Sequence, residues 1–139
     1  MAKIVYNAEI MKIMSLFENI TSSTIKDCII DPEQAIFIVK EGMISKAIGK
    51  KGSNVRTLEK KLNRKIKIVE FNSEIKTFIK NFILPLRVDE IEEEDNIVSL
   101  VSSVTATKSM LIGRNARNLR RIEEIARRYF PSLKEIKVI

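Results

Sequence analysis

The sequence predicts an α/β (α+β) fold of two tandem units, each running helix, strand, strand, helix, helix, strand around a three-stranded sheet. Three observations lead to this prediction. The order of helical and strand patterns occurs twice, two similar glycine-containing turns lie 64 residues apart, and 139 residues with 45% hydrophobic content suffice for one ordinary domain or two very small ones. The two units are expected at residues 1–71 and 72–139.

In the first unit, apolar residues at spacings of three and four predict helices, and apolar or alternating runs predict strands. The first expected element is a helix capped by Asn7, with its apolar face at residues 10, 13, 14 and 17. Two strands follow, over 25–30 and 35–39, joined by a turn at 31–33. A helix pair over 43–62, broken at Gly49 and Gly52, and a strand over 65–68 complete the unit.

The second unit repeats this order. It begins with a helix that is capped by Asn72 or Ser73, has its apolar face at residues 75, 78, 79 and 82, and is ended by Pro85. A strand over 86–91, a turn made by the acidic run within 89–95 and a strand over 97–104 are expected next. The unit closes with a short helix over 107–112, a turn at 113–116, a helix with its apolar face at 119, 122, 125 and 126, and a strand over 133–139.

The two broken helix pairs match residue by residue. With an offset of 64 residues, the identical pairs include Gly49 with Gly113, Ile48 with Ile112, Asn54 with Asn118, Arg56 with Arg120 and Glu59 with Glu123. Apolar, cationic and turn positions recur together, which disfavours a chance pair of solvated turns and indicates an internal repeat. Each turn feeds a helix N-terminus, where free N–H groups and the positive end of the helix dipole suit a phosphate.

The charge of the chain favours a polyanionic partner. The formal net charge is +7 and the isoelectric point is about 9.6. Six acidic residues fall between positions 89 and 95. The rest of the surface is therefore more basic than the total indicates, and the acidic run is expected to be a solvated turn.

The residues that most catalytic and metal sites need are missing. The chain has no histidine and one cysteine, Cys28, so the usual nucleophile–base pairs and zinc sites cannot be built. A P-loop also fails, because Ile44 and Lys51 stand where that motif needs glycine and serine or threonine. We therefore expect no enzyme, no metal and no cofactor. No apolar run suits a secretion signal or a membrane span, so a cytoplasmic location is expected.

The segment Ile48-Gly49-Lys50-Lys51-Gly52, between two helices, resembles the signature loop of KH domains. The order of elements resembles the type II arrangement of that family. Two such units in tandem resemble the short archaeal relatives of the transcription factor NusA. This resemblance implies that each loop holds the backbone of about four nucleotides of single-stranded RNA, with the bases in an apolar groove.

Carried over by position, the resemblance implies a role for each loop residue. Gly49 and Gly52 would admit phosphates to the main chain, Lys50 and Lys51 would supply charge, Ile48 and Val55 would form the groove floor with the strand 36–39 as its wall, and Asn54 and Arg56 would reach sugar or base edges. In the second unit the corresponding residues are Ile112, Gly113, Arg114, Asn115, Ala116, Arg117 and Arg120. Ala116 departs from the motif, which has glycine there. A negative φ at this position would tolerate alanine, whereas a positive φ would cost about 1–2 kcal/mol.

The function implied is that of a non-enzymatic single-strand RNA-binding factor in transcription elongation, termination or antitermination, acting as a monomer on the nascent transcript. Contact with RNA polymerase stays open, as does a mainly protein-binding role at the polymerase. The alternative is a ribosome-associated or ribosome-assembly protein that uses the same module on structured RNA.

Overall fold

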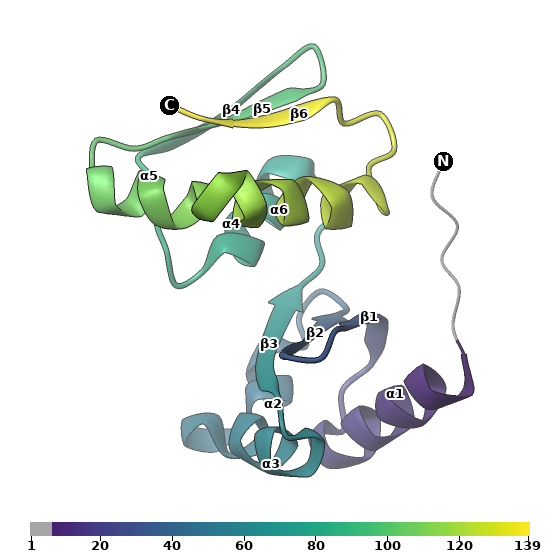
Figure 1. Cartoon of the computed structure of the whole chain (residues 1–139). Coiled ribbons are helices and arrows are strands. Elements are labelled where there is room, and N and C mark those ends of the chain that lie inside the picture. The colour runs from purple at the N-terminus through teal and green to yellow at the C-terminus, as the bar shows by residue number, and fades with distance from the viewer. Residues whose placement is uncertain (1–6) are drawn as a thin grey trace. The chain divides into compact units, whose positions relative to one another are not determined.

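A computed structural model describes residues 7–139 of the chain. They form two compact units, the first ending at Asn72 and the second beginning at Ser73. In each unit a three-stranded sheet has its helices on one face (Figure 1). Within the described part of the chain, no helix combines the length and the apolar character needed to cross a bilayer.

The first unit follows the predicted order of elements. It contains α1 (Ala8–Thr21), β1 (Ile25–Ile30), β2 (Gln34–Val39), α2 (Ile44–Ile48), a 3-10 turn η1 (Lys50–Gly52), α3 (Ser53–Leu62) and β3 (Lys65–Glu70). Strand β2 is central, antiparallel to β1 and parallel to β3. A parallel neighbour requires a crossover, and the helix pair α2–α3 supplies it.

The residues that form these elements explain them. Asn7 caps α1 as predicted, because its side chain accepts a hydrogen bond of 2.8 Å from the Ile10 N–H. Phe17 on α1 stacks on Phe37 of β2 with ring centroids 4.3 Å apart, and both side chains are fully buried. Leu58 of α3 joins the same core. The helices are thus held to one face of the sheet by apolar contacts.

The second unit repeats this architecture. It contains α4 (Ile75–Ile83), β4 (Glu90–Glu94), β5 (Ile97–Val101), α5 (Thr105–Ile112), η2 (Arg114–Ala116), α6 (Arg117–Arg127) and β6 (Glu135–Val138). Strand β5 is central, antiparallel to β4 and parallel to β6. The Phe78 ring of α4 lies 5.5 Å from the Tyr129 ring and 5.8 Å from the Phe130 ring, centroid to centroid. The α/β prediction of two units with three-stranded sheets is confirmed.

The start of the second sheet differs from the prediction. The predicted strand 86–91 is wrong, because the chain up to Asp89 precedes the strand, and the acidic run forms β4 itself rather than a turn. The turn is the pair Asp95–Asn96, whose φ values of 52° and 64° suit a two-residue hairpin. Backbone pairing with β5 overrides the low strand propensity of glutamate.

Smaller corrections concern the ends of elements. The N-cap of α4 is Glu74 without a side-chain cap, rather than Asn72 or Ser73. The apolar face of α4 is confirmed, since Ile75, Phe78, Ile79 and Phe82 are all buried. The strands near 97–104 and 133–139 are shorter than predicted, because each keeps only the residues that pair with its neighbour.

Candidate nucleic-acid interface

The two loops have nearly the same backbone geometry. Gly49 and Gly113 end α2 and α5 with φ/ψ of 79°/169° and 72°/175°. Two left-handed residues follow in each loop. Lys51 and Asn115 have φ of 53° and 57°, and the next residues, Gly52 and Ala116, have φ of 73° and 61°. The repeat seen in the sequence is therefore a repeat of conformation.

The first glycine of each loop makes room for an asparagine from the following helix. A Cβ on Gly49 would lie 2.8 Å from Cγ of Asn54, and one on Gly113 would lie 2.7 Å from Cγ of Asn118. The Asn54 side chain crosses this space and donates to the carbonyl of Lys46 at 3.1 Å.

Asn118 does the same in the second loop, donating to the carbonyl of Met110 at 2.9 Å. Each asparagine thereby binds a carbonyl in the last turn of the preceding helix and ties the two helices together. The resemblance implied contact with sugar or base edges for Asn54, whereas its Nδ2 donates a hydrogen bond within the protein and holds the loop.

At the second glycine position of each loop a side chain meets no clash, but the positive φ strains any residue other than glycine. A Cβ on Gly52 would meet nothing closer than Nη1 of Arg56, at 3.5 Å. Ala116 occupies the corresponding position with φ of 61°, so its methyl group fits while its backbone is strained. Of the two cases that the sequence left open at Ala116, the structure has the one with positive φ.

Replacing Ala116 by glycine is expected to raise the free energy of unfolding by about 0.5–1 kcal/mol. The gain is the left-handed penalty of about 1–2 kcal/mol less the extra unfolded-state entropy of glycine, about 0.4–1 kcal/mol. Urea unfolding measures it. The reciprocal change, Gly52→Ala, is the matched control and should lower stability by a similar amount. Equal stabilities of Ala116→Gly and the unchanged protein would contradict the strain.

Cationic side chains surround both loops. The exposed members are Lys50, Lys51, Arg56, Arg114, Arg117 and Arg120. Arg56 is folded back, and its Nη1 donates to the carbonyl of Lys51, which holds the guanidinium over the loop. Neither α3 nor α6 has a side-chain cap or an acidic residue in its first turn. Cations at an uncapped helix N-terminus are unfavourable unless an anion is bound there.

Apolar side chains lie beside the cations. Ile48 is 36% exposed, and Val55 and Ile112 are half-buried. These residues are therefore at the surface rather than in the core. The predicted wall of the groove is wrong, because residues 36–39 belong to the central strand β2 and are fully buried.

In the second unit an open groove runs between α6 and the edge strand β6. Its lining includes Ala116, Leu119 and Arg120 from the loop and helix, and residues 135–139 from the strand. Glu123 accepts a hydrogen bond of 2.7 Å from the Ile136 N–H, which fixes the strand to the helix.

Leu119 and the last strand were absent from the site predicted from sequence. The repeat offset could have found Leu119, since it corresponds to Val55. Nothing in the sequence indicated that the last strand lines the groove, because an edge strand is recognised only once the sheet order is known. Among residues 7–139 no group of three or more histidine, cysteine or acidic side chains is placed to hold a metal ion.

Comparison with known proteins identifies the family. A family model described as KH domain matches residues 12–83. The probable transcription termination protein NusA of Methanocaldococcus jannaschii is 35% identical over 134 residues, covering 94% of this chain and 72% of the relative. The chain belongs to the archaeal NusA-like family of KH-domain proteins. The corresponding protein of Methanococcus vannielii is 34% identical, covering 99% of this chain and 80% of its own.

The structural comparison agrees with this membership. The crystal structure of APE1850 superposes with a TM-score of 0.74 at 25% identity, covering 96% of this chain and all of the other. Both units of the NusA-like chain therefore have a counterpart of known structure. The family is one of transcription factors rather than enzymes, as the sequence predicts.

Proposed function

We propose that this NusA-like protein binds single-stranded RNA of the nascent transcript through its two loops, and acts in transcription elongation, termination or antitermination. The backbone of each loop, at residues 49–52 and 113–116, receives phosphates, and the neighbouring cations listed above neutralise them. The observation that carries the proposal is the pair of uncapped, cationic helix N-termini in a KH fold. In this proposal the protein binds RNA and does not catalyse a reaction.

The apolar surface beside each loop gives the bases a place. In the first unit Ile48 and Val55 are accessible next to Gly49, and in the second the groove between α6 and β6 starts at Ala116. Aliphatic side chains suit the faces of unstacked bases, and a groove of this kind cannot take a closed duplex. The two units are proposed as separate binding modules.

The proposed role in transcription rests on the names of the relatives. Those from two methanogens are named probable transcription termination proteins. Crosslinking in cells followed by sequencing of the bound RNA tests this role, and nascent messenger transcripts should be enriched. Enrichment of ribosomal RNA would instead support a ribosome-assembly protein. We propose that the protein acts as a monomer. Co-purification of RNA polymerase with it after nuclease treatment tests a direct contact.

The chain should prefer single-stranded to duplex RNA of the same sequence. If about four phosphates are neutralised, the logarithm of the affinity should fall with the logarithm of salt concentration at a slope of roughly −3. Fluorescence anisotropy with a labelled oligonucleotide over a series of salt concentrations measures both. Equal or tighter binding of the duplex would contradict the proposed mode.

A further inference from the structure

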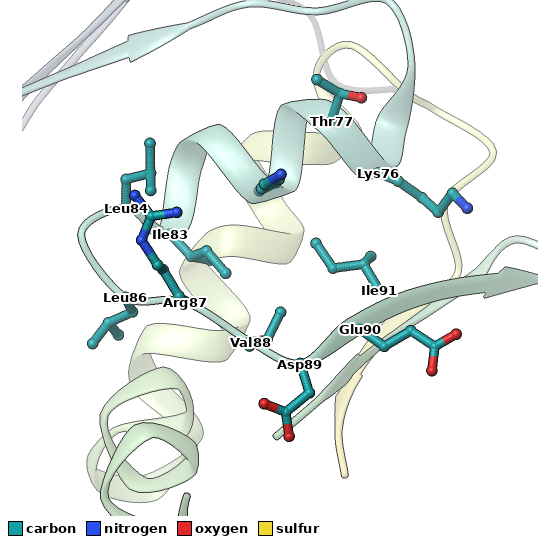
Figure 2. A pocket seen from close by; sticks show the side chains of 11 residues that line it. Lys76, Thr77, Ile83, Leu84, Leu86, Arg87, Val88, Asp89, Glu90 and Ile91 are labelled. Carbon is teal, nitrogen blue, oxygen red and sulfur yellow. The ribbon is translucent and has the colours of Figure 1, made fainter. Parts of the chain in front are cut away.

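A pocket of about 320 Å³ lies in the second unit, between α4 and the segment that leads from α4 into β4. Figure 2 shows Ile83, Val88 and Ile91 converging on it, Ile83 from α4, Val88 from the segment and Ile91 from the start of β4. Leu84 and Leu86 complete an aliphatic lining, and Leu84 is 40% exposed. A volume at the lower end of the range for ligand pockets suits one or two large side chains.

Cationic side chains border this pocket. They are Lys76 and Lys80 on α4 and Arg87 on the segment, and all three are exposed. The two lysines are four residues apart and so lie one turn apart on the same side of the helix. Figure 2 shows Lys76 at one end of the pocket and Arg87 at the other, so the positive charge is spread along the pocket rather than gathered at one point.

The two carboxylates that border the pocket point away from it. Figure 2 shows the side chains of Asp89 and Glu90 directed away from the space between the helix and the segment. Asp89 is also engaged, because its Oδ2 accepts a hydrogen bond of 2.7 Å from the Ser103 N–H. The pocket consequently presents an aliphatic floor and a cationic rim.

This combination distinguishes between possible occupants. Among residues 7–139, none that lines the pocket is aromatic, so this lining offers no platform for stacking a base. Nor do its cations converge, as they would on a single phosphate. Cations spaced along an aliphatic pocket match carboxylates spaced along a peptide on either side of an apolar side chain.

We propose that this pocket binds an acidic peptide segment of a partner protein. The segment inserts a large apolar side chain between Ile83, Val88 and Ile91 and places its carboxylates on Lys76, Lys80 and Arg87. The site uses none of the loop residues, so the protein would bind RNA and a protein partner on different surfaces. The proposal does not depend on RNA binding by the loops.

Selection of random dodecapeptides displayed on phage against the full chain tests this inference. The enriched peptides should combine a large apolar residue with at least two acidic residues. Synthetic copies should shift the backbone amide signals of Thr77, Val88 and Ile91 in NMR spectra. In the variant Lys76→Glu with Lys80→Glu, their affinity should fall at least about tenfold, and added salt should weaken binding to the unchanged protein.

The matched control is Lys60→Glu with Lys61→Glu, which makes the same charge change at exposed positions of α3 and should leave peptide affinity unchanged. Lys50→Asp with Lys51→Asp should also leave it unchanged, which separates this site from the RNA loops. The proposal is overturned if no acidic–apolar peptides are enriched, or if their affinity survives the Lys76 and Lys80 changes. It is also overturned if single-stranded RNA or unlabelled chain, rather than peptide, shifts the amides of the pocket.

Discussion

Changing both Lys50 and Lys51 to aspartate is expected to lower the affinity for single-stranded RNA by a factor of at least about 100. Each lysine is exposed at the tip of the first loop, and a hydrogen bond to a charged group contributes about 1.5–3 kcal/mol, so losing two accounts for this factor. The salt slope should fall from roughly −3 to about −1.5, because two phosphates are no longer neutralised. Anisotropy titration at several salt concentrations measures both quantities.

The fold should tolerate this double change. Lys51 has a φ of 53°, and aspartate adopts left-handed backbone more readily than lysine does. The circular dichroism spectrum should therefore stay normal. Unchanged affinity together with a normal spectrum would show that the first loop does not bind RNA.

The second loop provides the comparison. Arg114→Asp with Asn115→Asp should weaken binding less than the lysine change, because only one cation is lost at the tip and Arg117 and Arg120 remain exposed on α6. We expect the first loop to hold phosphates closely and the second mainly to attract RNA by charge. If the second-loop change is the more damaging, the arginine-rich helix is the principal RNA site.

Replacing Gly49 by alanine is expected to lower the free energy of unfolding by about 2–4 kcal/mol. Its φ/ψ of 79°/169° lies in a region that is nearly exclusive to glycine and costs about 1–3 kcal/mol for other residues. The new Cβ would also displace Asn54, 2.8 Å away, and break its bond to the Lys46 carbonyl, worth about 1 kcal/mol. Gly113→Ala should behave alike in the second unit. Urea unfolding measures both.

Gly42 is the matched control for this prediction. It has a φ of +86°, and among the described residues no atom beyond its chain neighbours lies within 4 Å of the position that a Cβ would take, so Gly42→Ala carries a positive-φ penalty without a clash. Removing the obstructing side chain as well, in Gly49→Ala with Asn54→Ala, should cost less than the two single changes added together. Costs of Gly49→Ala and Asn54→Ala that simply add in the double variant would mean that the asparagine does not impose the glycine.

Local pattern carried much of the fold prediction. The helices with a clear apolar face, such as Ile75, Phe78, Ile79 and Phe82 on α4, were found because burial of one face repeats every three to four residues. The acidic strand β4 was missed because the residues that make it a strand belong to β5. No local preference of a glutamate run indicates backbone pairing with a strand formed later in the chain.

The candidate site likewise has features that local sequence predicts and features that it does not. Glycines, cations and the 64-residue offset are local features, and they were sufficient to predict two loops of one kind. The wall of the groove was wrong because a central and an edge strand have similar composition and differ only in sheet order. No local sequence pattern indicated the aliphatic pocket beside α4, since Ile83, Val88 and Ile91 come together only when α4, the segment after it and β4 pack against one another.

The sequence by itself determined the tandem architecture, the positions of both loops and the cationic character of their helix N-termini, because helix periodicity, glycine breaks and charge act within a few residues. Only the tertiary structure decided that Ala116 has positive φ and that Asn54 serves the loop. Only the tertiary structure decided that β6 lines the groove of the second unit. Each of these depends on which backbone approaches which, and that is fixed by packing between elements distant in the chain.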